Sequence, residues 1–367
     1  MNAKALIICL FMAGPAGAQG FAGLGQDATG FAVPTRGQAL VFPRDHGAHP
    51  DYRIEWWYLT AVLRGEDGTD YGIQWTLFRS ALAPGERPGW QSPQLWLAHA
   101  ALTTPDRHFV AEKLARGGID QAGVTALPFS AWIDDWQMTA RTGAPGTDPM
   151  TARTGAPETG AMADAMAALD LTASGEGFGY RLGLQAQGPL VAQGDHGYSV
   201  KSAAGQASWY YSQPFYRAEG HLTVEGREIA VTGQAWLDRE WSSQPLAADQ
   251  TGWDWFSLMF DDGARLMGFR LRDAGAGFAS ATWIAADGTA VPMPPGALRV
   301  TPLRRASVAG RSLPVEWRVE LPEKALDVTV AALNDAAWMD LTVPYWEGPI
   351  AIRGSHRGRG YLEMTGY

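Results

Sequence analysis

Short runs of alternating apolar and polar residues recur along this chain, and Gly-centred turns separate them. Residues 71–79 and 94–103 are two such runs. The dipeptides between runs are typical of tight β-hairpins: Asp67-Gly68, Glu225-Gly226, Asp262-Gly263 and Asp287-Gly288. Helical periodicity is weak almost everywhere, and only residues 161–169 are suited to one or two helical turns. The pattern predicts an all-β fold.

Composition limits the class of protein. Apolar residues make up 46% of the 367 residues and charged residues 18%, which is typical of a globular chain long enough for two domains. The formal net charge of -9 argues against nucleic-acid binding, because that function needs a basic face.

The amino terminus has the features of a cleavable signal peptide over residues 1–18. Lys4 precedes an apolar run at 5–13, and Ala16-Gly17-Ala18 is a small-x-small cleavage site, so we expect cleavage after Ala18. The single cysteine, Cys9, lies in this segment. These features predict a periplasmic or secreted protein, with a flexible leader at residues 19–40.

An internal duplication interrupts the strand pattern. Residues 138–161 repeat a twelve-residue unit, MTARTGAPGTDP followed by MTARTGAPETGA. Such small and polar residues cannot form a core, so this segment is predicted to be a disordered insertion. We expect a first domain at 41–190 and a second at 191–367.

A second, weaker repeat relates the two halves of the chain. Glu55 stands before Trp56-Trp57, and Arg79 ends the returning strand; Asp254 stands before Trp255, and Arg270 or Arg272 ends the corresponding strand. A buried carboxylate needs a partner, so each half is expected to contain an Arg–carboxylate pair that closes one end of a barrel. The adjacent aromatic residues suit the mouth or floor of a barrel that holds an apolar ligand.

Several longer segments carry a family resemblance. They are FPRDHGAHPDYRIEWWYLT, YGIQWTLFRS, WLAHAAL, WYYSQP, GQAWLDREW, GWDWFSLMFDDGARLMGFRLR, YWEG and GRGYLEMTGY. In these segments the chain resembles the family of AttH and carotenoid 1,2-hydratases (CrtC-type), whose AttH-like branch is often labelled as secreted hydrolases. The resemblance implies two tandem lipocalin-like antiparallel β-barrels.

The hydratases of that family also suggest site residues. Their pattern has Tyr-x-Asp where this chain has Trp236-x-Asp238, and His-x-Trp near Trp209-Tyr210-Tyr211. Asp238 is therefore retained, whereas the tyrosine is replaced by tryptophan and the histidine is missing. These differences favour the AttH-like branch.

Residues 236–241 contain the strongest candidates for catalytic residues. Side chains alternate in a strand, so Asp238 and Glu240 share one face, about 7 Å apart. A carboxyl kept protonated by apolar surroundings can protonate a double bond. We predict Asp238, Glu240 and Tyr211 as catalytic residues. The alternative is an internal salt-bridge lattice of the two acids with Arg239, Arg217 or Arg270.

Histidines offer a second candidate site. Asp45, His46 and His49 form a D-H-x-x-H pattern that His99 could approach. Zinc needs three or four converging ligands, so the pattern is predicted to tie down a loop, with no metal and no cofactor. The aromatic segments either line an apolar pocket or form a core between barrels. The residues predicted to contact a ligand are Glu55, Trp57, Trp209, Tyr210, Trp236, Trp253, Asp254, Trp255, His46 and His99.

Three functions follow. The first is binding of an apolar, lipid-like or isoprenoid-like small molecule. The second is an enzyme acting on such a ligand, a hydratase or hydrolase with Asp238 as proton donor. The third, implied by the resemblance to AttH, is an accessory of an ABC-type export permease.

Overall fold

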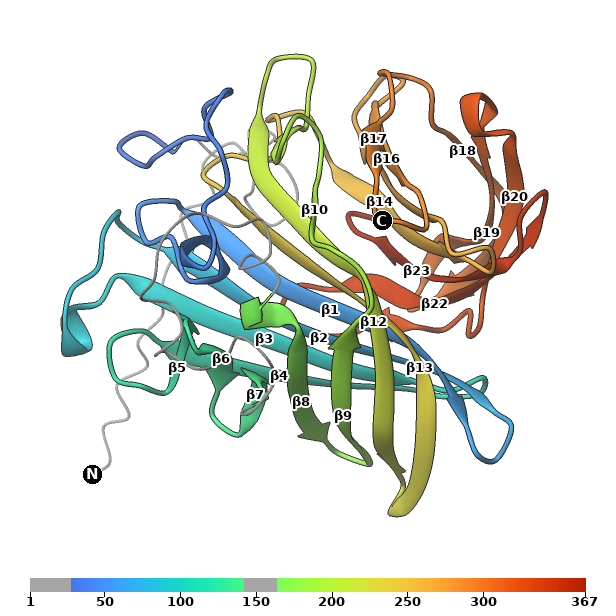
Figure 1. Ribbon diagram of the computed structural model, residues 1–367, viewed down its shortest axis with the longest axis horizontal. Helices are drawn as coiled ribbons and strands as arrows, with labels where there is room; N and C mark the ends of the chain where they lie inside the picture. Colours follow the sequence, from blue (N-terminus) through green and yellow to red (C-terminus); the bar gives the residue numbers. More distant parts are fainter. Residues whose placement is uncertain (1–27, 142–163) are drawn as a thin grey trace, which may run out of the picture.

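The structure is a computed structural model that describes residues 28–141 and 164–367. These residues form two antiparallel sheets and short 3-10 turns, and the all-β prediction is confirmed (Figure 1). The predicted signal peptide at 1–18 lies outside the described residues, as do 19–27 of the leader and 142–161 of the insertion. No helix among the described residues is long and apolar enough to cross a bilayer. The 3-10 turns are η2 (Arg44–His46), η3 (Gly89–Gln91), η5 (Asp164–Met166) and η6 (Pro322–Lys324).

The first sheet has thirteen strands within the described residues and curls nearly into a barrel (Figure 1). In spatial order they are β4 (His108–Arg116), β3 (Gln94–Thr103), β2 (Asp70–Ala81), β1 (Ile54–Gly65), β13 (Arg227–Ser242), β12 (Ala207–Val224), β9 (Phe178–Ala186), β8 (Ala168–Gly175), β7 (Trp136–Ala140), β6 (Phe129–Ile133) and β5 (Ala122–Ala126), while β10 (Val191–Ala192) and β11 (Tyr198–Val200) also pair with β12.

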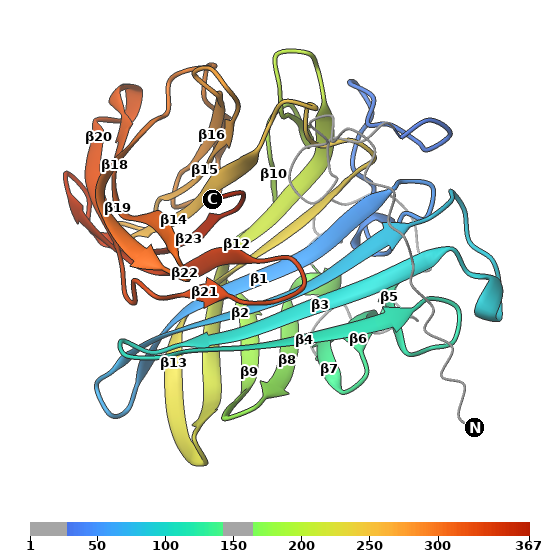
Figure 2. The same cartoon turned by 180° about the vertical axis from the view of Figure 1, so that it is seen from behind.

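The second sheet has ten strands within the described residues and forms a half-barrel against the first (Figure 2). In spatial order they are β17 (Ala290–Pro292), β16 (Phe278–Ile284), β15 (Arg265–Arg272), β14 (Gly252–Phe260), β23 (Gly358–Met364), β22 (Tyr345–Gly354), β20 (Leu326–Ala332), β19 (Arg311–Leu321) and β18 (Arg299–Val308), with β21 (Trp338–Met339) beside β22.

The division between the sheets differs from the predicted boundary near residue 190. β12 and β13 return to the first sheet, where β13 pairs with β1 along the whole length of β1. The chain passes to the second sheet only at residues 243–251. In each sheet, the strand that comes first in the sequence also pairs with the strand that comes last. In the first sheet β1 lies beside β13, and in the second β14 lies beside β23.

The turns, strands and leader predicted from the sequence agree with the structure only in part. All four predicted turn dipeptides lie between paired strands. Residues 129–138, expected to be strand-like, form two strands, β6 and β7, around a turn at Asp134-Asp135. Residues 28–40 of the expected leader form no strand, yet Ala32 bonds to Asp51 through the backbone and Arg36 pairs with Asp195.

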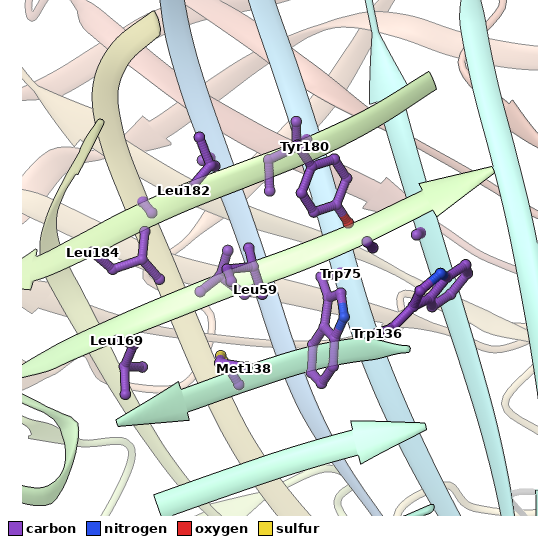
Figure 3. Packing of buried hydrophobic residues seen from close by; sticks show 14 of the residues in the cluster. Leu59, Trp75, Trp136, Met138, Leu169, Tyr180, Leu182 and Leu184 are labelled. Carbon is purple, nitrogen blue, oxygen red and sulfur yellow. The ribbon is translucent and has the colours of Figure 1, made fainter. Parts of the chain in front are cut away.

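The interior of the first sheet is filled by side chains. Figure 3 shows Tyr180, Leu182 and Leu184 of β9 packed near Leu59 of β1 and Trp75 of β2. These side chains are almost fully buried. A ligand inside this barrel, at the strand entrance where we expected it, would therefore have to displace close-packed core.

The repeated Arg–carboxylate pair is present in both halves. Glu55 stands opposite Arg79 in the β1–β2 register and forms an ion pair with it. Arg239 reaches the other carboxylate oxygen of Glu55 at 3.1 Å and lies 3.8 Å over the ring of Trp57. In the second half, Asp254 forms its ion pair with Arg272. The predicted pairing is confirmed.

Loss of one arginine from this buried network should destabilise the protein strongly. In Arg239→Met the Glu55 carboxylate keeps Arg79 but loses a partner in a fully buried place, which costs about 3 kcal/mol of unfolding free energy. Urea unfolding followed by tryptophan fluorescence measures the loss. Arg141→Met removes an exposed pair with Asp170 and should barely change the midpoint. Equal effects of the two variants would contradict the structural role of the network.

Candidate functional site

A cavity of about 230 Å³ lies between the two sheets. Its wall includes Tyr58 from β1, Asp238 and Glu240 from β13, Trp255 from β14 and Glu363 from β23. It therefore lies on the outer face of the first sheet, and not inside the barrel. Side-chain alternation explains this placement, because Tyr58 faces the second sheet whereas its neighbours on β1 face the core.

Asp238 is buried at this cavity without an ionic partner. Ser212 Oγ and Trp236 Nε1 donate to its Oδ1 at 2.5 and 2.7 Å, and Tyr210 OH donates to its Oδ2 at 2.6 Å. Burial raises the pKa of Asp238 to about 7, although these hydrogen bonds act in the opposite direction. The carboxyl is therefore able to hold a proton near neutral pH.

The alternative of a salt-bridge lattice does not hold for Asp238. Among the described residues it forms no ion pair, while Arg239 pairs with Glu55 and Arg217 with Glu219. Asp238 and Glu240 both line the cavity, so their predicted common face is present.

Glu240 differs from Asp238 because it has a cationic partner. Lys201 Nζ lies 2.8 Å from Glu240 Oε1. The same ammonium lies 4.8 Å from the ring centre of Tyr210 and 4.3 Å from that of Phe269. The ammonium of Lys201 thus balances the charge of Glu240 and also contacts two aromatic rings on the cavity wall.

The second sheet contributes two further carboxyls. Glu363 and Glu347 stand opposite each other on β23 and β22. Trp253 Nε1 donates to Glu363 Oε1 at 2.7 Å, and Tyr58 OH donates to Glu347 Oε1. Burial raises the pKa of Glu363 to about 7, and the nearby charges of Asp238 and Glu240 add to this shift. Burial and then the charge of Glu363 raise the pKa of Glu347 well above its usual range.

Glu55 and His99 also touch the cavity but are held in other networks. Burial alone would raise the pKa of Glu55, but Arg79, His49 and Arg239 outweigh it and keep that pKa well below its usual range. His99 Nδ1 lies 2.9 Å from Tyr345 OH, and burial lowers the pKa of His99 to about 4. Glu55 is therefore an ionised structural group, and His99 is neutral near pH 7.

The histidine pattern does not form a common site. His46 Nδ1 bonds to Tyr211 OH at 2.7 Å, and His49 bonds to Glu55 and Asp45. The described residues contain no group of three or more His, Cys, Asp or Glu that could hold a metal ion.

Tyr211 does not lie at the Asp238 site, so its predicted catalytic position is wrong. β12 pairs with β13 so that Tyr210 lies opposite Glu240, Tyr211 opposite Arg239 and Ser212 opposite Asp238. Tyr210 and Ser212 therefore share the cavity face, whereas Tyr211 lies on the opposite face. Tyr210 is the tyrosine that bonds to the acid.

The other predicted ligand contacts divide in the same way. The structure brings seven predicted site residues to the cavity wall: Glu55, His99, Tyr210, Asp238, Glu240, Trp253 and Trp255. Trp236 is not part of the wall but donates a hydrogen bond to Asp238. Trp57 lies in the core, Trp209 and His46 lie on the opposite face, and Asp254 is bound to Arg272. Those four positions are corrected.

Sequence reasoning missed several wall residues. Tyr58, Lys201, Tyr345 and Glu363 were not among the predicted contacts, nor was Glu347 behind Tyr58. A usable signal existed for three of them, because Tyr345, Glu347 and Glu363 lie in the segments YWEG and GRGYLEMTGY, which place acids within apolar strands.

Comparisons with known proteins agree with this architecture. A model of the AttH-like family matches residues 33–367. The chain belongs to the AttH-like family. The crystal structure of an AttH protein from Nitrosomonas europaea is 33% identical to this AttH-like chain, with a TM-score of 0.76 over 92% of this chain and 100% of that chain. The predicted lipocalin-like, two-barrel fold is therefore confirmed.

A more distant enzyme shares the fold. Kievitone hydratase from Nectria haematococca aligns with a TM-score of 0.65 over 92% of the AttH-like chain and 96% of its own, at 14% identity. At that identity the likeness shows the fold alone. A comparison with curated protein sequences gave no match.

The raised pKa of Asp238 predicts a pH-dependent stability. The unfolded chain releases the Asp proton near pH ~4, whereas the folded protein keeps it up to about pH 7. The stability from this proton is complete below about pH 4 and is lost as the pH rises to about 7, because the folded state then binds more protons than the unfolded state. Asp238→Asn removes this titration.

Urea midpoints at several pH values measure the effect. Relative to the wild type, Asp238→Asn should gain stability steadily from about pH 4.5 to about pH 7.5. Asp170→Asn, at an exposed position of β8, serves as the control. A difference between Asp238→Asn and the wild type that stays constant over this range would show that Asp238 does not titrate there.

Proposed function

We propose that this protein binds an apolar, lipid-like or isoprenoid-like small molecule in the cavity between the sheets. The supporting observation is the composition of the wall, where aromatic and aliphatic side chains surround a few hydrogen-bonding groups. Trp56, Trp253, Trp255, Phe269 and Leu271 are among the apolar side chains of this wall. Sites for apolar ligands combine such surface with a small number of placed polar groups.

The packing around the cavity supports binding over a purely structural aromatic core. Cores are close-packed and leave few voids larger than a water molecule. Here Tyr58 and Trp255 meet edge to face at 5.3 Å, yet the rings leave about 230 Å³ unfilled. Unfilled space next to apolar rings forgoes dispersion contacts. An apolar ligand would restore those contacts.

Both sheets and the segment that links them enclose the proposed ligand. Pro245 and Leu246 of the link lie on the wall together with strands of each sheet. A molecule in this place buries surface against both sheets at once. This enclosure suits capture of a small molecule from water.

Filling the cavity should abolish this binding. Leu271 lies on the wall and is 4% exposed, so Leu271→Trp places a larger side chain in the ligand's space. We expect the neutral dye N-phenyl-1-naphthylamine to bind the wild type and to bind the variant about tenfold more weakly, a change of about 1.4 kcal/mol. Fluorescence titration measures both affinities.

Leu303→Trp is the matched control, since Leu303 is an exposed leucine of β18. It should leave the dye affinity unchanged. Circular dichroism and thermal melting check that both variants fold. If the wild type does not bind the dye, or if Leu271→Trp binds it as the wild type does, the proposed site is wrong.

The environment of Asp238 favours a second candidate function, hydration of a carbon–carbon double bond. The Asp238 carboxyl is able to hold a proton near neutral pH and lines a cavity with several aromatic rings, and proton transfer to an alkene requires such an acid. Its proton would add to one alkene carbon and leave a cation on the other. Water would then bond to that cation and return a proton to the Asp238 carboxylate. The surrounding rings would stabilise the cation, and the shared fold with a hydratase fits this candidate.

Labelled water tests the hydration candidate. With a panel of acyclic isoprenoids that includes geranylacetone, the wild type should incorporate one oxygen from H₂¹⁸O, detected by mass spectrometry. Asp238→Asn should lose this activity by at least about a hundredfold while still binding the dye. Asp170→Asn should match the wild type. Equal incorporation by Asp238→Asn would exclude Asp238 as the proton donor.

A further inference from the structure

The acids around the cavity differ in whether a basic residue forms an ion pair with them. Glu55 has two arginines, and Glu240 has Lys201. In contrast, no ion pair joins Asp238, Glu347 or Glu363 to a basic residue anywhere in the described ranges 28–141 and 164–367. Three carboxyls thus share one region with only neutral donors. Removing carboxyls from water without a cation is costly.

Glu347 also lacks a cationic partner within the described residues. Its side chain is fully buried, and the two groups that hydrogen-bond to it, the hydroxyls of Tyr58 and Tyr345, are neutral. Because Glu347 lies directly opposite Glu363 on the neighbouring strand, both side chains stand on the same face of the sheet. That face borders the cavity, since Glu363 is part of the wall.

The cavity already contains one example of ammonium recognition. Lys201 places its ammonium between the Glu240 carboxylate and the rings of Tyr210 and Phe269. On the second sheet, Glu363 accepts a hydrogen bond from Trp253, while Tyr58 of the first sheet contacts Trp255 and donates to Glu347. Among the residues that the structure describes, no basic side chain forms an ion pair with the two acids of this second group. Acids combined with aromatic faces are the usual recognition site for organic ammonium ions.

We propose that the ligand of this cavity carries an ammonium group, which binds against Glu363 among the rings of Tyr58, Trp253 and Trp255, while its apolar part occupies the rest of the cavity. The inference rests on the proposed binding function and specifies the class of ligand. The ammonium would supply a counter-charge for Asp238 and Glu363, which form no ion pair within the described residues.

The titratable groups around the site predict how pH affects such binding. The first sheet and its loops present Asp238, Glu240, Lys201, Tyr58, Tyr210 and His99, together with the ion pair of Glu55 and Arg79, and the second sheet presents Glu347, Glu363 and Tyr345. Asp238 and Glu363 both have a pKa of about 7. A bound cation favours their ionised forms, so it competes with their protons. Affinity for a permanent cation should therefore rise as the pH increases through about 7.

A matched set of probes tests the charge preference: octyltrimethylammonium, octan-1-ol and octanoate, each used to displace N-phenyl-1-naphthylamine. At about pH 7.5 we expect the ammonium to bind about tenfold more tightly than the alcohol, and octanoate to bind most weakly. From about pH 6 to about pH 8 the affinity of the ammonium should rise several-fold, while that of the alcohol stays constant. The ammonium itself does not titrate, so the change reports the protein.

Two variants test which residue is responsible for the preference for the ammonium. Glu363→Gln should remove most of the preference for the ammonium and leave octan-1-ol binding intact. Glu228→Gln, an exposed glutamate of β13, should behave as the wild type. If octan-1-ol or octanoate binds as tightly as the ammonium, this inference is overturned while the proposed binding function stands. If none of the three probes nor the dye binds, the proposed function fails as well.

Discussion

The arrangement of side chains on the paired strands β1 and β13 determines both the core and the cavity. On β13, Leu237 and Arg239 face the interior of the first sheet, and Asp238 and Glu240 face the second sheet. A slip of one residue in this pairing would place the acids in the core and the apolar groups at the cavity. The ion pair between Glu55 of β1 and Arg239 of β13 joins these two strands and disfavours such a slip. The buried charge network therefore also orients the site.

Two buried carboxyls near these strands show how partners decide the role of an acid. Glu55 receives two guanidinium groups and remains ionised. Asp238 receives three neutral hydrogen-bond donors, which offset burial only in part. Since hydrogen bonds from neutral groups compensate a charge less than a guanidinium does, Asp238 gains a proton where Glu55 does not. Although both carboxyls are buried, Glu55 is a structural group, whereas Asp238 is able to transfer a proton or to bind a cation.

The sequence predicts the elements that depend on local pattern. Alternation and turn dipeptides identify the β-strands and hairpins, and the repeated acid–arginine spacing identifies both buried pairs. Alternation also places Asp238 and Glu240 on one face. It cannot decide between Tyr210 and Tyr211, because either tyrosine can face β13 until the register of β12 is known. The domain boundary failed for a related reason: the loop-rich segment near residue 190 resembles a linker, and only the long-range pairing of β13 with β1 shows that the sheet continues.

Residues from the second sheet illustrate the same limit. Glu363 and Glu347 approach Tyr58 only because the two sheets dock, and no local pattern reports that contact. The docking is close: a side chain at Gly72 of β2 would come within 2.5 Å of Pro349 on β22, so a glycine is needed where the sheets meet. At another contact between the sheets, Arg265 of β15 donates to the carbonyl of Pro214 in β12.

Because acids and rings come from both sheets, neither sheet alone can form the cavity. Any molecule that binds there contacts both, and its binding free energy adds to the stability of their docking. The docking of the two sheets also accounts for the acids that form no ion pair within the described residues. Asp238 on one sheet and Glu363 on the other are brought together by docking, so the repulsion between them is a cost of the interface itself. Protons on these carboxyls relieve that repulsion, and a bound cation would relieve it further.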